Sequence, residues 1–192
     1  MNSRWLLLKQ FLLHPVRVGA VMPSGPELCR ELVTWLNAEK ASALAELGPG
    51  TGVVTAEIMR QISPNTRFFA VELDPVICRE LQKNMPQLRL YNANACDLVK
   101  LCAQDGVAEL DAVVSGLPWA SFPESLQRDL LTAVTNALKK GGKFSTFAYL
   151  QGMAMPGGRR FRKLLSEYFT QVDFSPVVWN NFPPAVVYRC IK

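Results

Sequence analysis

The residue types and spacing that point most directly to chemistry are three glycines that follow an acidic residue, in Glu46-Leu-Gly-Pro-Gly-Thr-Gly52. This segment joins an apolar run over 43–47, typical of a buried strand, to a helical pattern that begins at Val53. A strand that leads through a glycine-rich turn into a helix brings backbone close to a ligand at the helix N-terminus. The dinucleotide-binding pattern is G-x-G-x-x-G, whereas here the third glycine comes one residue early.

The E-x-G-x-G-x-G form resembles motif I of the class I S-adenosylmethionine (SAM) methyltransferases. The resemblance implies that Glu46 lies near the ammonium group of SAM, directly or through water. An acidic residue suits this ligand, which carries a cationic sulfonium and an amino group but no pyrophosphate. The turn residues implied to contact its methionine part are Gly48, Gly50, Thr51 and Gly52. A nicotinamide-dinucleotide domain or a purely structural turn is the alternative.

Further cofactor contacts are expected at the ends of the next two predicted strands, because ligands bind at the carboxyl ends of such sheets. Glu72 lies about 20 residues after the turn, where an acidic residue commonly binds ribose hydroxyls. A solvated strand end is the alternative for Glu72. After the third strand the resemblance implies an acceptor for the adenine amino group, either Asn94 or Asp97, and Asp97 also suits a helix N-cap. The expected contacts beyond the turn are Glu72, Leu73, Asn94, Ala95 and Asp97.

The loop Ser115-Gly-Leu-Pro-Trp119 follows the fourth predicted strand, where methyltransferases acting on the amino groups of bases carry N-P-P-Y or D-P-P-Y. The Asn or Asp that begins this motif is replaced here, and this change weakens the hypothesis that the methyl acceptor is a nucleobase. Together with segments 18–25 and 179–188, this loop resembles the small bacterial phospholipid N-methyltransferases, over nearly the whole chain. The resemblance implies methyl transfer from SAM, leaving S-adenosylhomocysteine (SAH), to the amine of an ethanolamine-type phospholipid headgroup.

Aromatic faces stabilise the fixed cation that N-methylation produces. We expect Trp119 and Tyr149 to contact the methylated headgroup, and we place Ser115 with them as a catalytic residue. An ordinary core position is the alternative for each ring. The expected substrate-binding residues are Pro118, Trp179, Arg159 and Arg160, the two arginines as a clamp for a lipid phosphate. A solvated helix face over 158–168 is the alternative for these arginines.

The chain is basic, with a net charge of +5 over 192 residues, which suits an anionic partner such as a membrane. Residues 1–24 are expected to form an amphipathic helix and a substrate-side extension. This helix either lies in a membrane interface or covers the sheet. The residues that would face lipid headgroups are Arg4, Trp5, Lys9 and Arg17. We expect a cytoplasmic protein, peripheral on the inner face of the membrane, with an anionic or amino-phospholipid surface as partner and no nucleic acid.

Five cysteines without a C-x-x-C pair, and a single histidine, predict reduced thiols and no metal site. No apolar stretch reaches the ~18–20 residues of a membrane-spanning helix.

Apolar strands and helical segments alternate along the chain, which predicts a doubly wound, mostly parallel α/β sheet in a single domain over 1–192. The resemblance implies a seven-stranded, Rossmann-like class I methyltransferase sheet. A helix is expected over 124–139, closed by Gly141-Gly142, with a strand over 143–150. The last two strands, near 170–179 and 185–191, are expected to form an antiparallel edge pair.

Two other function classes are consistent with these patterns. One is a relative of the rRNA adenine dimethyltransferases, or a small-molecule methyltransferase with the same fold. The other is a catalytically inactive protein that binds SAM or a membrane. The altered loop at Ser115 and the lack of an appended RNA-binding domain count against an RNA substrate.

Overall fold

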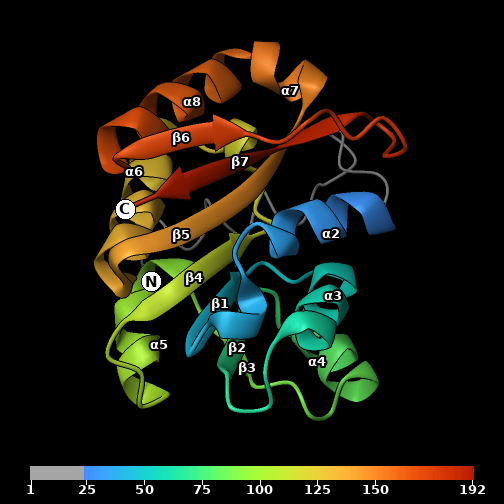
Figure 1. The fold of residues 1–192 in the computed structure, drawn as a ribbon, viewed down its shortest axis with the longest axis vertical. Helices are drawn as coiled ribbons and strands as arrows, with labels where there is room; N and C mark the ends of the chain where they lie inside the picture. The colour runs from blue at the N-terminus through green and yellow to red at the C-terminus, as the bar shows by residue number, and fades with distance from the viewer. Residues whose placement is uncertain (1–23) are drawn as a thin grey trace.

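The described part of the chain, residues 24–192 of the computed structural model, forms a seven-stranded sheet with helices on both faces (Figure 1). The strands are β1 (Ala43–Leu47), β2 (Arg67–Glu72), β3 (Leu90–Asn92), β4 (Leu110–Ser115), β5 (Leu138–Tyr149), β6 (Gln171–Phe174) and β7 (Ala185–Ile191). The helices are α2 (Pro26–Thr34), α3 (Val53–Gln61), α4 (Pro75–Asn84), α5 (Leu98–Gln104), α6 (Glu124–Ala137), α7 (Leu150–Ala154) and α8 (Pro156–Tyr168). Short 3-10 turns are η2 (Ala38–Lys40), η3 (Ala95–Asp97) and η4 (Trp119–Ser121). The helix expected near the N-terminus, with Trp5, lies outside the described residues.

The strand order is β3-β2-β1-β4-β5-β7-β6, with β1 to β5 parallel and β7 antiparallel to both β5 and β6. The predicted doubly wound sheet with an antiparallel C-terminal pair is therefore confirmed. The chain leaves β1 toward β2 and later returns to its other side as β4. This reversal places a topological switch point at the carboxyl ends of β1 and β4, where ligands bind in such sheets.

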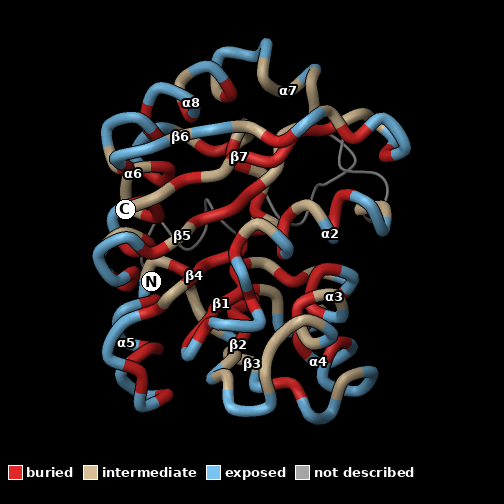
Figure 2. Tube along the Cα trace, in the orientation of Figure 1, coloured by how far each residue is buried: buried red, intermediate tan, exposed pale blue. Residues whose placement is uncertain are grey.

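Both faces of the sheet are buried, which explains why the central strands are continuous apolar runs. Ala45 and Leu47 of β1 belong to the core that α5, α6 and α8 cover, whereas Leu44 belongs to the core under α2 and α3. Figure 2 shows the central strands buried along most of their length. Phe144 of β5 stacks on Phe169 with ring centroids 5.4 Å apart, which fixes the end of α8 against the sheet.

The predicted end of the helix over 124–139 was wrong. α6 ends at Ala137, and the chain enters β5 at once, with Leu138 paired to Leu110. The register then shifts, because the next pair joins Ala112 to Lys143, and residues 139–142 form a bulge. Gly141 takes a positive φ of 73° within this bulge instead of capping a helix. Leu138 is fully buried in the sheet, and this burial favours the strand over a further helical turn.

The N-terminal turn of α8 packs directly on η4. Gln127 of α6 donates from Nε2 to the carbonyl oxygens of Trp119, at 2.6 Å, and Gly157, at 3.3 Å. A Cβ added to Gly157 would lie 2.0 Å from the carbonyl oxygen of Ala120. Only glycine permits this close approach, so Gly157 sets the distance between α8 and η4.

Gly157→Ala is expected to lower the free energy of unfolding by about 1–3 kcal/mol, because its methyl group overpacks this contact. In an ordinary helix, replacing glycine with alanine raises the free energy of unfolding by about 1 kcal/mol, so the change expected here has the opposite sign. Gly152→Ala in α7 is the control, since its Cβ would lie 4.0 Å from that of Ala120, an ordinary contact. Urea unfolding followed by circular dichroism measures both variants. Equal stability of the two variants would contradict the close approach.

Candidate functional site

The turn after β1 bends around open space at the switch point. Gly48, Gly50 and Gly52 have positive φ angles of 71°, 55° and 84°, a conformation that favours glycine. A Cβ on Gly48 would lie 2.7 Å from Cδ2 of Leu117, so this position is packed. A Cβ on Gly50 would meet no atom of the described chain within 4 Å, so this position faces open space. Thr51, at the tip of the turn, is exposed.

Glu46 lies beneath this turn with 1% of its surface exposed. Its Oε2 accepts a hydrogen bond from Oγ1 of Thr55, in the first turn of α3, at 2.7 Å. Burial raises the pKa of Glu46 to about 8, with a smaller contribution from the charge of Glu72. A neighbouring cation would favour the ionised carboxylate. The geometry therefore fits the ammonium contact that the resemblance implies for Glu46.

Glu72 ends β2 on the other side of the turn. Its carboxylate accepts from the backbone N–H of Asp74 at 3.0 Å and of Gly50 at 3.4 Å, and burial raises its pKa. Asn92 of β3 stabilises the backbone at the end of β2, because its Nδ2 donates to the carbonyl oxygens of Glu72 and Leu73 at 3.0 and 2.9 Å. Leu73 itself is buried in the core. Glu72 is thus held beside the turn, where a ribose contact is predicted.

The residues expected to meet adenine follow β3. Oδ1 of Asn94 accepts from the backbone N–H of Cys96 at 2.9 Å, so Asn94 caps η3. Ala95 is buried and Asp97 is exposed. Asp97 occupies the N-cap position of α5 but makes no capping hydrogen bond with its side chain. The adenine contact of either side chain stays a prediction.

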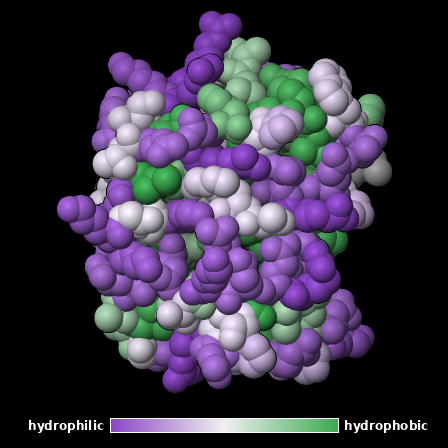
Figure 3. Space-filling model, viewed as in Figure 1, coloured by the Kyte–Doolittle hydropathy of each residue, from purple (hydrophilic) through white to green (hydrophobic). Residues whose placement is uncertain are grey.

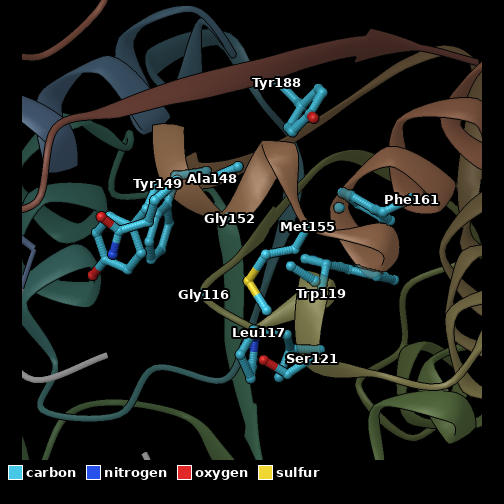
Figure 4. Close-up of a pocket in the computed structure, with 15 residues that line it drawn as sticks. Gly116, Leu117, Trp119, Ser121, Ala148, Tyr149, Gly152, Met155, Phe161 and Tyr188 are labelled. Atoms are coloured by element: carbon cyan, nitrogen blue, oxygen red, sulfur yellow. The ribbon is translucent and has the colours of Figure 1, made fainter. Parts of the chain in front are cut away.

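A cavity of about 130 Å³ opens next to the turn (Figure 4). Its walls come from the loop between β4 and α6, the end of β5, α7, the start of α8 and one residue of β7. Pro118, Trp119 and Tyr149 line it, and no charged side chain of the described chain does. The lining therefore offers no ion pair to a bound group.

The aromatic lining is held by packing. The ring of Trp119 stacks on Phe161 of α8 with centroids 4.6 Å apart, and only 2% of Trp119 is exposed. The ring of Tyr149 lies 5.4 Å from that of Phe147 and is half-buried. Tyr149 is thus the more accessible of the two rings that we expect to contact the acceptor.

Ser115 is fully buried at the end of β4 and does not line the cavity. Its Oγ accepts hydrogen bonds from Nε1 of Trp119 at 3.1 Å and from the backbone N–H of Leu117 at 3.3 Å. These bonds orient the indole and the loop, so the geometry favours a positioning role. A catalytic role for Ser115 stays a prediction.

The predicted substrate-binding residues of α8 differ in their surroundings. Arg160 points inward, where Nε donates to Oε1 of Gln127 at 3.1 Å and Nη2 donates to the carbonyl oxygen of Phe122 at 3.0 Å. A phosphate contact would have to compete with these two bonds. Arg159 is exposed, and Trp179, 71% exposed, lies outside the cavity lining. The phosphate clamp stays a prediction.

The turn and the cavity are joined by backbone. Gly116, which lines the cavity, donates its N–H to the carbonyl oxygen of Leu47 at 2.8 Å. A Cβ on Gly116 would lie 2.6 Å from the carbonyl oxygen of Gly48. A donor bound at the turn and an acceptor in the cavity would therefore be immediate neighbours.

Sequence reasoning missed three features of this site. Thr55, Asn92 and Gly116 orient Glu46, Glu72 and the cavity loop, respectively. A threonine facing inward in the first turn of α3 was a signal for Thr55. The contacts of Asn92 and Gly116 depend on neighbouring strands, which the local pattern does not show.

Within residues 24–192, no three side chains of the types that bind metals lie close enough to hold an ion. No helix of the same residues is sufficiently long and apolar to cross a bilayer. No disulfide links the five cysteines, all of which lie within residues 24–192, and burial raises the pKa of Cys29, Cys78 and Cys102 to about 11. These thiols are therefore protonated near neutral pH and poor nucleophiles.

Comparison with known proteins identifies the donor of this site. A family model described as a methyltransferase domain matches residues 44–142, from β1 through the bulge of β5. An ornithine lipid N-methyltransferase from Singulisphaera acidiphila is 32% identical over 195 residues, which cover 99% of this chain and 96% of that protein. The chain belongs to the SAM-dependent methyltransferases. Its cofactor is SAM, and the fit of Glu46, Gly50 and Glu72 to that ligand agrees with this assignment.

More distant similarities agree with the fold. A ribosomal RNA small subunit methyltransferase A from Acaryochloris marina is 23% identical over 92% of this chain, which spans 65% of that protein. An O-methyltransferase from Bacillus cereus, solved in complex with SAH, has a TM-score of 0.69 and 13% identity. The match covers 100% of this chain and 92% of that structure. This methyltransferase therefore has the class I fold that its sequence predicts.

SAM binding is expected to strengthen as the pH rises from about 6 to about 7.5. Glu46 is largely protonated below its pKa of about 8 in the free protein, and the bound ammonium group requires the carboxylate. Binding therefore releases a proton, and affinity gains up to about tenfold per pH unit. Titration calorimetry in buffers of different ionisation enthalpy measures this proton release.

Glu46→Gln should bind SAM more weakly and release no proton. Glu57→Gln, the same chemical change on α3 beside Arg60, is the control and should keep the wild-type pH dependence. A pH dependence that survives in Glu46→Gln would show that another group supplies the proton.

Proposed function

We propose that this methyltransferase transfers methyl groups from SAM to the amine of an ethanolamine-type phospholipid headgroup, as a peripheral protein on the cytoplasmic face of a membrane. The cavity beside the SAM turn carries the proposal. Its volume of about 130 Å³ is small beside the ~300–1,000 Å³ of pockets that enclose drug-sized ligands. In this proposal the headgroup enters this space while the acyl chains stay in the bilayer. The similarity to an ornithine lipid N-methyltransferase supports an amino lipid as acceptor.

The exposed apolar side chains support a membrane on the same side as the cavity. The large hydrophobic residues that are exposed within residues 24–192 are Val53, Val76, Val99, Met155, Trp179 and Phe182. The valines begin helices that follow parallel strands, Met155 precedes α8, and the two aromatic residues precede β7. All six thus lie toward the carboxyl edge of the sheet. Figure 3 shows apolar side chains gathered around α7 and the loop before β7.

Trp179 and Phe182 are the most exposed of these residues, at 71% and 77%. The loop before β7 that carries them is held in place, because the buried Asn181 between them accepts a hydrogen bond at Oδ1 from the N–H of Gly25 at 2.8 Å. Aromatic side chains are favoured at the headgroup level of a bilayer. A fixed aromatic tip beside the cavity would therefore hold the entrance at the lipid surface.

The cavity is suited to an amine that must be neutral to react. Bound SAM supplies an electrophilic methyl group. The uncharged lining disfavours an ammonium ion, so a headgroup amine that enters would lose its proton to solvent and offer its lone pair. The Gly116 loop and Tyr149 would then hold the nitrogen in line with the methyl carbon. The aromatic faces of Tyr149 and Phe147 would stabilise the cation that accumulates with each transfer.

An RNA adenine dimethyltransferase is the second candidate, favoured by the similarity to the ribosomal RNA enzyme and by the basic chain.

One assay separates the candidates. Methyl-labelled SAM is incubated with phosphatidylethanolamine vesicles, ornithine lipid vesicles, unmodified ribosomal RNA or soluble amines. We expect label in phosphatidylethanolamine. Label only in ornithine lipid would assign a different lipid headgroup as acceptor. Label in RNA or soluble amines would assign a different class of acceptor, and no label in any pool would indicate an inactive binding protein.

Trp179→Ala combined with Phe182→Ala is expected to weaken binding to phosphatidylethanolamine vesicles about tenfold or more, because two apolar anchors are lost. Vesicle co-sedimentation measures binding. Methylation of monomeric dihexanoyl phosphatidylethanolamine and the affinity for SAM should stay unchanged, and these serve as controls. Unchanged vesicle binding would contradict this docking surface.

A further inference from the structure

Tyr188 of β7 combines a buried position with access to the cavity. Only 1% of its surface is exposed, yet it lines the cavity together with Phe161 (Figure 4). Its ring is fixed from two sides, by Phe161 at 5.7 Å in an edge contact and by Phe174 of β6 at 4.9 Å. The ring position is therefore determined by packing and does not require the hydroxyl group.

The hydroxyl group of Tyr188 makes no hydrogen bond within residues 24–192. The fully enclosed side-chain polar atoms without a partner in that range are Oδ2 of Asp105 and Nε of Arg189. Tyr188 Oη is not among them, and Tyr188 lines the cavity, so a group bound there is placed to supply the missing partner. A hydroxyl in an apolar site gains most from a partner that the ligand supplies.

Strand register places Tyr188 at the far end of the cavity from the SAM turn. Leu47, Ser115, Thr146 and Tyr188 are consecutive partners across β1, β4, β5 and β7. Three strand spacings separate the first from the last, on the order of 14 Å between backbones. Gly116, at the near end, adjoins the turn. An acceptor that spans the cavity would thus present its amine at Gly116 and another group toward Tyr188.

The charge near this far end is positive. The guanidinium of Arg162, on the exposed face of α8, lies 4.9 Å from the ring centre of Phe174, which in turn contacts Tyr188. Burial raises the pKa of Tyr188 to about 12, so the phenol is protonated and can donate at neutral pH. A proton donor close to a cation is suited to an anionic oxygen.

We propose that Tyr188 is a substrate-binding residue whose hydroxyl donates a hydrogen bond to an anionic oxygen of the acceptor headgroup, a phosphate or a carboxylate. This inference rests on the amino-lipid function proposed above and names a specificity contact within it. The bond fixes the headgroup at one end while the amine reaches the methyl group at the other. An amine without an anionic oxygen gains nothing from this contact.

Tyr188→Phe tests the contact, because it removes one oxygen and keeps the ring packing. With dihexanoyl phosphatidylethanolamine as acceptor, KM should rise about 10- to 100-fold, the loss expected for a hydrogen bond to a charged group. Octylamine, which has the amine but no anionic oxygen, is measured as a competitive inhibitor. Its inhibition constant should be the same for both proteins, within about twofold.

Tyr168→Phe is the matched control, since Tyr168 lies on α8 outside the cavity lining, with its hydroxyl 3.3 Å from Oγ1 of Thr132. It should leave KM for the lipid unchanged, and both variants should bind SAM with wild-type affinity. Equal lipid KM values for wild type and Tyr188→Phe, or an equal loss with octylamine, would overturn the role of Tyr188 alone. A wild-type protein that methylates neither phosphatidylethanolamine nor ornithine lipid would overturn the proposed function and this role together.

Discussion

A backbone contact between the turn after β1 and the loop after β4 is the constraint on which the site depends. The N–H of Gly116 donates to the carbonyl oxygen of Leu47 at 2.8 Å, and any Cβ at Gly116 would lie 2.6 Å from the carbonyl oxygen of Gly48. The two loops therefore meet through main chain at Gly116, and the side chain of Leu117 packs against Gly48 beside this contact. Within residues 24–192, the sheet therefore fixes the donor side and the acceptor side relative to each other. Methyl transfer needs such alignment more than it needs an acid or a base.

The two sides of this contact differ in their electrostatics. Glu46 and Glu72 surround the turn, and burial raises the pKa of both, that of Glu46 to about 8, so the free site holds at Glu46 a carboxyl group that a cationic ligand can ionise. The cavity beyond Gly116 has no charged side chain among its described lining residues. A cationic donor is thus favoured on one side, and a neutral amine is favoured on the other.

Sequence patterns predicted the fold and the cofactor turn because these depend on local features. Apolar runs alternating with helical segments determine a parallel sheet, and the spacing of Gly48, Gly50 and Gly52 distinguishes the turn from a dinucleotide site. The prediction of individual positions failed where they depend on contacts between residues far apart in the sequence. Gly141 lies in a bulge because Leu138 is buried beside Leu110, and Trp119 is mostly buried because Phe161, 42 residues later, stacks on it. Sequence patterns did not predict Tyr188 as a cavity residue for the same reason, since its place in the cavity depends on its pairing with Thr146.

A structure of the protein with SAH and dihexanoyl phosphatidylethanolamine would show how donor and acceptor lie relative to each other. We expect the SAH sulfur to lie beside the Gly48–Gly50 turn and the headgroup amine to lie in the cavity next to Gly116 and Tyr149. The nitrogen should face the sulfur across the space of one methyl group. A headgroup bound elsewhere on the surface, or SAH bound away from Glu46 and Glu72, would contradict this arrangement.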